Sequence, residues 1–279
     1  KYSDIRERIK IFKGDVKNED WLNEIFVNCK KENNPIMGVI HFAGLKAVAE
    51  SVKNPISYWE GNLVSSISLL KVMQNNKCFV IVFSSSATIY KASSELIKED
   101  FEKEPINPYG QTKLSIEKML HNVYESDKKK WKIINLRYFN PIGAHFSGII
   151  GESPLGKPNN IFPIIGKVAM GLIVKLSIFG NDWPTRDGTC IRDYIHVMDL
   201  ADAHTSSLKF LINKKPQIIN LNVGTGIGTS VLELVNTFEE VNNCKINYNF
   251  CERRPGDVSV LIADNKKVIS LLNWEPKRD

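Results

Sequence analysis

Apolar residues in the first half of the chain follow two patterns in turn, one typical of amphipathic helices and one typical of short buried strands. Residues 18–34 have apolar side chains at helical spacing, and residues 38–43 form a short apolar run that predicts a strand. The same order recurs in a helix predicted over 62–74 and a strand predicted over 79–84. This alternation is typical of a parallel sheet covered by helices.

A third repeat extends the pattern and locates its functional edge. A helix that carries Tyr109 and Lys113 precedes a strand predicted over 132–138. We therefore predict an α/β fold with a doubly wound parallel sheet of Rossmann type, in which ligands bind at the carboxyl ends of the strands. The segments that follow the predicted strands share that edge: Ala43-Gly44, Ser84-Ser85-Ser86 and Tyr138-Phe139-Asn140.

Glycine and proline residues accumulate beyond the last of these strands, which predicts a second, smaller α/β unit that begins near Pro141. We assign residues 1–141 to a dinucleotide-binding domain, with a return segment near 191–225. Residues 142–190 and 226–279 are assigned to a substrate domain.

Composition narrows the class of protein. The chain has 279 residues, of which 43% are hydrophobic and 24% are charged, values typical of a globular protein with a large core. Its longest apolar stretches, such as residues 79–83, are much shorter than the roughly 18 residues of a membrane span, and its start does not resemble a signal peptide. We expect a soluble, cytoplasmic protein that does not act at a membrane.

Neither nucleic-acid binding nor metal binding is predicted. The net charge of +6 is spread along the chain, and Lys128-Lys129-Lys130 is a short run typical of a solvated helix end. The five cysteines are scattered, odd in number and without a Cys-x-x-Cys pair. Such cysteines are typical of reduced packing residues rather than of disulfides or a zinc site.

Tyr109 and Lys113 are a candidate acid/base pair. Residues at i and i+4 share a helix face, so the Lys113 ammonium can favour the ionised form of the Tyr109 phenol. Lowering the phenol pKa by about three units requires roughly 4 kcal/mol, more than one lysine supplies, so a second positive charge is expected nearby. The pair alone is weak evidence, because 8 Tyr among 37 Lys and Arg produce about one such pair by chance. An exposed helix pair remains the alternative.

Four long strings occur in order along the chain: His41-Phe42-Ala43-Gly44-Leu45-Lys46-Ala47-Val48, Phe83-Ser84-Ser85-Ser86-Ala87-Thr88-Ile89-Tyr90, Leu136-Arg137-Tyr138-Phe139-Asn140-Pro141 and Ile191-Arg192-Asp193-Tyr194-Ile195-His196-Val197-Met198-Asp199-Leu200. At these strings the chain resembles the extended short-chain dehydrogenase/reductase family, and within it the sugar-nucleotide 4-epimerases. The resemblance implies reversible epimerisation at C4 of UDP-glucose and UDP-galactose, through hydride transfer to bound NAD and a 4-keto sugar.

By this resemblance, Tyr109 is the acid/base, Lys113 lowers its pKa and holds the nicotinamide ribose, and Ser86 hydrogen-bonds the C4 oxygen. The further cofactor contacts that it implies are Asp15, Val16, Phe42, Ala43, Gly44, Lys46, Asn62, Ser84 and Tyr138. The nucleotide-sugar contacts that it implies are Ser86, Tyr138, Phe139, Asn140, Asn159, Asn160, Ile161, Ser177, Ile178, Phe179, Arg192, Arg254, Asp257 and Leu261.

Some of these residues have a plain structural alternative. Ser86 can cap a strand end, Asp15 can cap a turn or a helix, and Asn62 can be a helix N-cap. Two histidines, His41 and His196, lie in apolar segments and receive no role.

The two arginines have a sound chemical case. A UDP-sugar carries a diphosphate, and guanidinium groups such as those of Arg192 and Arg254 bind phosphate oxygens bidentately. Salt bridges to Asp193 or Asp257 are the alternative for both.

The chain departs from the family at its start. A dinucleotide-binding fold opens with a strand, a glycine-rich turn, a helix and a second strand, and none of these precedes Gly14, the first glycine. Gly224-Thr225-Gly226-Ile227-Gly228 is predicted to be a loop before a helix over 231–238, and is weak as a phosphate loop. We therefore expect the sheet to lack its first βαβ unit and the sequence to be N-terminally incomplete.

Two smaller departures concern chemistry. Lys91 replaces the glycine usual at its position, and Leu261 stands where related bacterial epimerases have a bulky tyrosine. A smaller residue there leaves space for an N-acetyl group, so the N-acetylhexosamine pair is a second candidate substrate class.

Three rival functions remain at this point. A 4,6-dehydratase of the same superfamily needs an acid and a base beside the serine, where this chain has Ala87 and Thr88. A reductase and a non-catalytic scaffold are the other two. The resemblance also implies a homodimer, for which the helices near 62–74 and 112–124 are the candidate contacts.

Overall fold

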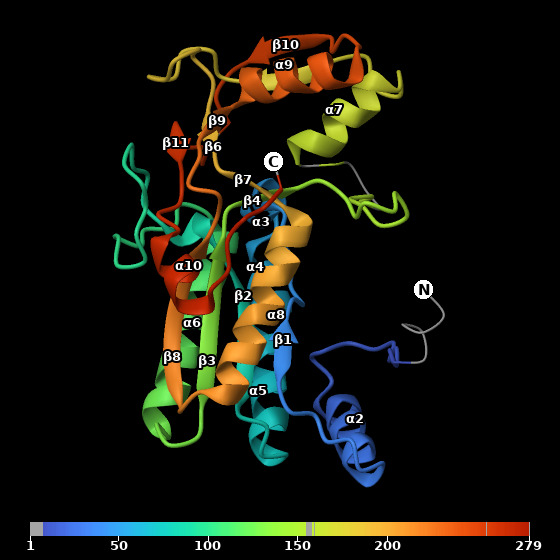
Figure 1. Cartoon of the computed structure of the whole chain (residues 1–279), viewed down its shortest axis with the longest axis vertical. Helices are drawn as coiled ribbons and strands as arrows, with labels where there is room; N and C mark the ends of the chain where they lie inside the picture. The colour runs from blue at the N-terminus through green and yellow to red at the C-terminus, as the bar shows by residue number, and fades with distance from the viewer. Residues whose placement is uncertain (1–7, 155–157, 159, 255, 279) are drawn as a thin grey trace.

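A parallel sheet of four strands forms the centre of the molecule, in a computed structural model that describes residues 8–154, 158, 160–254 and 256–278. Its order is β1-β2-β3-β8, and β3 pairs along its whole length with both neighbours (Figure 1). The strands are β1 (Val39–His41), β2 (Val80–Ser86), β3 (Lys132–Tyr138) and β8 (Gln217–Val223). The predicted α/β class with a parallel Rossmann-type sheet is confirmed.

Successive side chains of a strand point to opposite faces of a sheet, and helices cover both faces here. On one face Ile81 and Phe83 pack against α2 (Glu19–Lys31), α5 (Ser65–Asn75) and α6 (Pro108–Ser126). On the other face Val82 and Ile134 pack against α8 (Val197–Asn213) and α10 (Lys266–Leu272). The core is therefore continuous on both sides of β2 and β3, and the strand ends are held rigidly.

The helix predicted over 62–74 is part of a longer helical run. It comprises α3 (Val48–Lys53), α4 (Pro55–Trp59), a π-helical turn η1 (Glu60–Val64) and α5. Pro55 begins a new helix, since proline is favoured at the first helical position, which separates α3 from α4. The π-helical turn contains Asn62, and such turns occur frequently at functional sites.

A second group of elements lies beyond the carboxyl ends of the sheet strands (Figure 1). Its core joins α7 (Ile161–Ala169), α9 (Val231–Asn242) and β5 (Leu176–Phe179), and β5 pairs with β10 (Tyr248–Cys251). Short pairings connect the remaining strands: β4 (Asn140–Ile142) with β7 (Tyr194–His196), and β6 (Ile191–Arg192) with β9 (Thr229–Ser230) and β11 (Val260–Leu261). The predicted helix over 231–238 extends to Asn242 as α9.

Strand ends differ from the sequence predictions by one or two residues. The strand predicted over 79–84 continues to Ser86, so all three serines belong to β2, and a 3₁₀ turn η2 (Ala87–Ile89) follows directly. The strand predicted over 38–43 is confined to β1, because Phe42 leaves the sheet and is half-exposed.

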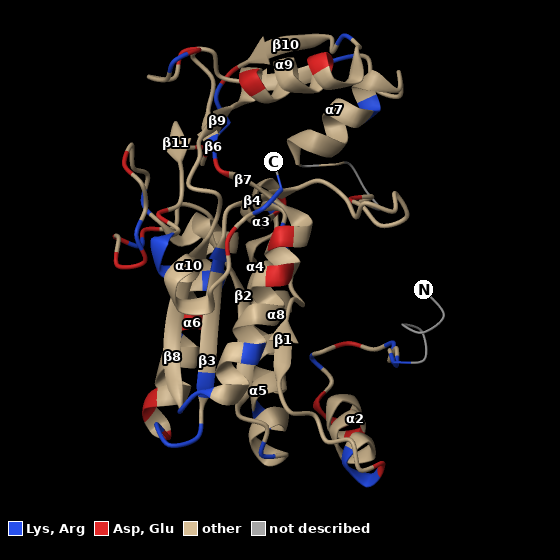
Figure 2. Cartoon of the chain, in the orientation of Figure 1, with Lys and Arg blue, Asp and Glu red and all other residues tan. Residues whose placement is uncertain are grey.

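Surface charge and the cysteines agree with the composition. Figure 2 shows Lys and Arg interspersed with Asp and Glu over the helices and loops. In the described part of the chain all five cysteines are free, no cluster of ligands suits a metal ion, and no helix is long and apolar enough to cross a membrane.

Candidate active site

Helix α6 presents Tyr109 in its first turn, directly after η2. Asn107 caps the helix, since its Oδ1 accepts a 2.9 Å hydrogen bond from the backbone N–H of Gly110. A Cβ at Gly110 would lie 2.6 Å from the carbonyl oxygen of Thr88, so only glycine lets the helix approach the end of β2 this closely. The cap and the glycine together bring Tyr109 beside the serines.

Ser86 is a hydrogen-bond partner of the Tyr109 phenol. Its Oγ accepts bonds from the backbone N–H of Thr88 at 3.2 Å and from the Thr88 hydroxyl at 3.0 Å. Because these two donors use the lone pairs of the Ser86 oxygen, the Ser86 hydroxyl proton is left to be donated to another acceptor. Ser86 therefore both caps η2, as its structural alternative predicts, and supplies a donor to the phenol oxygen.

Lys113 lies one turn beyond Tyr109 and is buried. Its Nζ donates a 2.8 Å hydrogen bond to the carbonyl oxygen of Ser84 and lies 5.8 Å from the centre of the Tyr109 ring. Burial lowers the pKa of Lys113 to about 8, against the opposing charge of Glu117. The ammonium is thus held over the strand end and toward the tyrosine.

The phenol itself is not ionised by these neighbours alone. Burial raises the pKa of Tyr109, the nearby Tyr138 raises it further, and the hydrogen bond from Ser86 lowers it only in part. The sequence analysis predicts that Lys113 alone does not supply enough charge and that a second positive charge is needed nearby. The burial of Tyr109 gives a physical reason for that expectation.

Gly44, in the loop after β1, lies close to both Asn62 and Lys113. A Cβ at Gly44 would lie 2.9 Å from Asn62 Oδ1 and 3.8 Å from Lys113 Nζ, so a side chain would fill the space beside the ammonium. The Asn62 amide holds the loop, because Oδ1 accepts from Leu45 N at 2.6 Å and Nδ2 donates to Leu45 O at 3.1 Å. The residues present fit NAD, and the alternative of a helix N-cap for Asn62 is wrong, since this residue lies inside η1.

Asn62 also reaches the catalytic helix. Its Nδ2 donates to Thr112 Oγ1 at 2.9 Å, and the Thr112 hydroxyl donates to the carbonyl oxygen of Tyr109 at 2.7 Å. One buried amide therefore connects the loop after β1 to the first turn of α6.

Ser84 connects the aromatic residues of the predicted nicotinamide side. Its Oγ lies 3.0 Å from His204 Nε2 and is hydrogen-bonded to Tyr138. His204 Nδ1 lies 2.8 Å from the carbonyl oxygen of Leu200, which only a protonated Nδ1 can bond, so Nε2 is the acceptor for Ser84. The ring of Phe42 packs on His204 with centroids 4.6 Å apart.

Arg192 and Arg254 converge on one carboxylate. Arg192 Nη2 lies 3.5 Å from Asp257 Oδ1, and Arg254 Nε donates to Asp257 Oδ2 at 3.1 Å. The Arg254 guanidinium also lies 4.7 Å from the centre of the Phe179 ring. Two guanidinium groups, an aromatic ring and a carboxylate thus lie together, although Phe179 and Arg192 are far in sequence from Arg254 and Asp257.

The second arginine alternative, a bond to Asp193, is absent in the described chain. Asp193 is fully buried and instead accepts from the N–H groups of Thr225, Gly226 and Ala263. A Cβ at Gly224 would lie 2.4 Å from Asp193 Oδ2. The glycine-rich loop therefore binds an internal carboxylate, which explains its composition without a phosphate.

Other predicted contacts lie around these groups. Phe139 is buried, Asn140 begins β4, and Leu261 pairs with Arg192 between β11 and β6. Asn160 donates to Glu152, which forms a 3.6 Å ion pair with Lys46.

Six predicted residues have no direct contact with these groups or lie outside the described residues. Asp15 accepts from the N–H of Lys17 and so caps a turn, as its structural alternative predicts, and Val16 packs against the helix core. Ile161 and Ile178 pack into the core shared by α7 and α9, whereas Ser177 is exposed. Asn159 lies outside the described residues.

Comparison with known proteins identifies the family. The family model described as GDP-mannose 4,6 dehydratase matches residues 1–279. UDP-glucose 4-epimerase of Bacillus subtilis is 47% identical over 260 residues, covering 93% of this chain and 76% of that protein. The bifunctional UDP-glucose and UDP-xylose 4-epimerase 1 of Pisum sativum is 45% identical over 277 residues, covering 99% and 77%.

Solved structures agree. UDP-glucose 4-epimerase from Bifidobacterium longum in complex with NAD⁺ and UDP has a TM-score of 0.90 and 42% identity, over 96% of this chain and 78% of that one. The chain belongs to the UDP-glucose 4-epimerase family. The UDP-Glc/GlcNAc 4-epimerase of Campylobacter jejuni is also similar, with a TM-score of 0.82, 33% identity and coverage of 100% and 83%.

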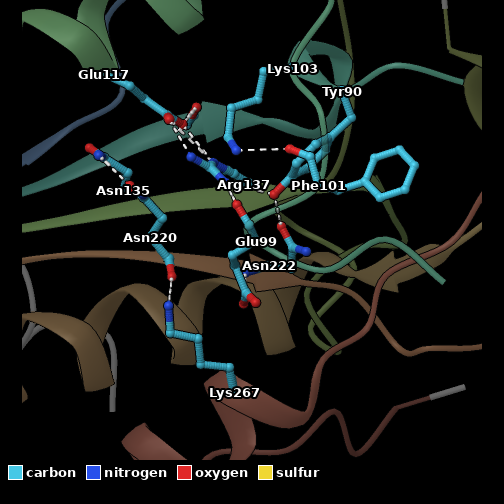
Figure 3. Close-up of polar contacts among 11 residues, drawn as sticks. Tyr90, Glu99, Phe101, Lys103, Glu117, Asn135, Arg137, Asn220, Asn222 and Lys267 are labelled. Atoms are coloured by element: carbon cyan, nitrogen blue, oxygen red, sulfur yellow. Dashed lines mark hydrogen bonds and ion pairs between the residues drawn. The ribbon is translucent and has the colours of Figure 1, made fainter.

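Sequence reasoning missed a set of buried polar residues behind this epimerase site. Glu117 accepts from Arg137 Nε at 3.0 Å and from Arg137 Nη2 at 2.6 Å (Figure 3). It also accepts from the Ser85 hydroxyl. Arg137 Nη1 donates to Tyr90 OH at 2.8 Å, and Tyr90 OH donates to Asn222 Oδ1 at 2.7 Å. The signal that could have found Glu117 is its spacing, since positions 109, 113 and 117 share one helix face.

Proposed function

We propose that this chain carries the catalytic machinery for reversible C4 epimerisation of UDP-glucose and UDP-galactose with bound NAD. The observation that carries the proposal is the convergence of Ser86, Tyr109 and Lys113 at the carboxyl end of β2. NAD is the cofactor, as in the related epimerases whose structures contain it. When bound, it accepts a hydride from C4 of the sugar and returns it to the opposite face.

Side chains of this protein carry out the proton transfer at the C4 hydroxyl. Tyr109 removes the proton of the C4 hydroxyl and returns it at the end of the reaction, and Ser86 donates a hydrogen bond to the C4 oxygen. Lys113 stabilises the phenolate by its charge, and the oxidised nicotinamide supplies the second positive charge that the burial of Tyr109 requires. The burial of Ser86, Tyr109 and Lys113 limits the access of water to the groups that handle the proton.

We assign nucleotide binding to the group of side chains around Asp257. Arg192 and Arg254 pair with the diphosphate, and Asp257 holds both guanidinium groups in place before the substrate arrives. Phe179 supports the Arg254 guanidinium from its flat face. Anchoring by the diphosphate leaves the hexose itself able to turn between its two faces.

Dehydration is disfavoured by the residues beside Ser86. A 4,6-dehydratase needs a carboxyl acid and a base there, whereas Ala87 is buried and apolar and the Thr88 hydroxyl is bonded to Ser86. The family model's dehydratase description therefore reflects shared ancestry of the fold more than shared chemistry.

The test is the conversion of UDP-galactose to UDP-glucose by the holoenzyme. Tyr109→Phe should lower kcat by roughly 10²- to 10⁴-fold while NAD stays bound, because only the transferable proton is lost. Tyr248→Phe, at a half-exposed position on β10, is the matched control and should leave turnover unchanged. Full activity of Tyr109→Phe would refute the mechanism, and a wild type that binds NAD but does not epimerise would favour a scaffold.

We further infer a homodimer. The helices near 62–74 and 112–124 are the proposed contacts, and support comes from apolar side chains exposed on the same helical run, Val52, Ile56 and Val64. Light scattering should report a dimer for the wild type and a monomer for Ile56→Asp combined with Val64→Asp. A cytoplasmic location is inferred from the five free thiols, and cell fractionation tests it.

A further inference from the structure

Three charged residues of alternating sign are buried along one face of the catalytic helix and the strand beneath it. Lys113 and Glu117 lie one turn apart on α6, and Arg137 comes from β3, each with 5% or less of its surface exposed. Isolated charges are rarely buried, so each must be compensated by a partner. The choice of partner decides where the Lys113 ammonium points.

Glu117 could form an ion pair with Lys113 or with Arg137, and it pairs with Arg137. Lys113 is within the i,i+4 spacing at which helical ion pairs form. The structure nonetheless joins Glu117 to Arg137 through Nε and Nη2, and in the described residues no ion pair joins it to Lys113. The Lys113 ammonium is bonded to the Ser84 carbonyl oxygen instead, on the side of Tyr109 and Gly44.

Each nitrogen of the Arg137 guanidinium donates at least one hydrogen bond in this network. Nε and Nη2 bond Glu117, while Nη1 donates to Tyr90 OH at 2.8 Å and to the Glu99 carbonyl oxygen at 2.7 Å (Figure 3). The Ser85 hydroxyl donates to Glu117 Oε1, the same oxygen that accepts from Arg137 Nε. A guanidinium fixed at four points cannot move to follow the carboxylate, so the pair has one geometry.

We propose that Glu117 and Arg137 are positioning residues of the active site: Arg137 cancels the charge of Glu117, so that Lys113 directs its ammonium to Ser84 and Tyr109 instead of to the carboxylate one turn away. The inference rests on the proposed function for its catalytic consequence. The groups that face Lys113 are Tyr109 and Glu117 from α6, the Ser84 carbonyl and Phe83 from β2, His41 from β1, and Asn62 from η1.

The two single variants have opposite expected effects. In Arg137→Met the uncompensated Glu117 attracts the ammonium and opposes the phenolate, so the pH at which Tyr109 ionises should rise by about one unit. In Glu117→Gln the uncompensated Arg137 adds positive charge, and the same ionisation should move to lower pH. The double variant Arg137→Met with Glu117→Gln restores neutrality and should return to the wild-type pH.

The experiment measures this ionisation in two ways on the NAD-bound protein. The near-ultraviolet absorbance of the phenolate is titrated with pH, using Tyr109→Phe in each background as the blank, and kcat is measured over the same range. Tyr90→Phe is the matched control, because it removes one bond to Arg137 in the same buried network without changing any charge. Its ionisation pH should equal that of the wild type.

The outcomes separate the two proposals. A purely structural pair would lower stability without moving the ionisation, so equal pH values in the wild type and both single variants would overturn the inference. Shifts of the same sign in all three variants would overturn it as well. If Arg137→Met does not fold, Glu117→Gln still tests the sign, and a wild type that shows the phenolate titration without epimerisation would refute the proposed function alone.

Discussion

Lys113 Nζ donates a 2.8 Å hydrogen bond to the carbonyl oxygen of Ser84. The bond fixes the ammonium over the end of β2, where the next two serines hold different partners. Ser85 donates to Glu117 and Ser86 bonds Tyr109, and both of these partners belong to α6. The three serines therefore have three different partners: Lys113, Glu117 and Tyr109. Successive positions of a strand face different sides, and the strand ends at Ser86.

Lys113→Met should separate stability from activity. Since burial lowers the pKa of Lys113 from 10.5 to about 8, the unfolded state binds more protons between those pH values, and the wild-type free energy of unfolding should rise as the pH increases through them. Lys113→Met removes this rise, which is of order 3 kcal/mol, and should raise the Tm at pH 7 while it lowers kcat. Lys118→Met, at an exposed position of α6, is the control for both.

Arg254→Ala should weaken substrate binding. Loss of a charge-assisted pair with the diphosphate is expected to raise KM for UDP-galactose by roughly 10- to 100-fold, with a smaller effect on kcat. The adjacent Arg253 is the matched control, because it bonds Asp182 and stacks on Trp183 instead. Equal effects of Arg253→Ala and Arg254→Ala on KM would contradict the assignment.

Leu261→Tyr should change the choice of sugar. Leu261 packs against the cluster of Ala87, Phe139 and Ala263, so a larger ring at this position reduces the space beside Ser86. We expect the ratio of kcat/KM for UDP-N-acetylglucosamine to that for UDP-glucose to fall by about 10-fold or more in Leu261→Tyr and to rise in Leu261→Ala. A ratio that does not respond to either change would remove Leu261 from the sugar pocket.

His41 should make the protein sensitive to mild acid. Burial and the charge of Lys113 lower the pKa of His41 from 6.5 to about 4, so the unfolded state takes up a proton first as the pH falls. The free energy of unfolding should therefore decrease between pH 6.5 and pH 4, by about 3 kcal/mol at most. Urea denaturation of His41→Gln, which can keep a bond to Ser66, should show a flatter dependence on pH in this window.

Residue patterns predicted the parallel sheet and the edge of it at which we place the candidate active site. The alternation of helical and strand patterns predicted the parallel sheet, and the spacing of Tyr109 and Lys113 predicted a shared helix face, which α6 confirms. Local rules suffice for such features, because side-chain periodicity depends only on backbone geometry.

Side-chain periodicity does not predict which partner each charged residue has in the folded protein. Glu117 could pair with Lys113 by spacing alone, but β3 brings Arg137 to it from 20 residues away, and only their packing settles the competition. The same holds for Asp193, which accepts hydrogen bonds from backbone N–H groups of the glycine-rich loop. Arg192 pairs with Asp257 instead.

The sequence by itself predicted which groups would move a proton and bind a diphosphate, Tyr109, Lys113, Ser86, Arg192 and Arg254, because residue types, their spacing and the resemblance to a known family depend on the sequence alone. Only the tertiary structure decided their charge states and directions. Burial raises the pKa of Tyr109 and lowers that of Lys113, and a buried ion pair on the next turn leaves the ammonium to the active site. Desolvation and long-range pairing arise from the folded environment, which no local pattern contains.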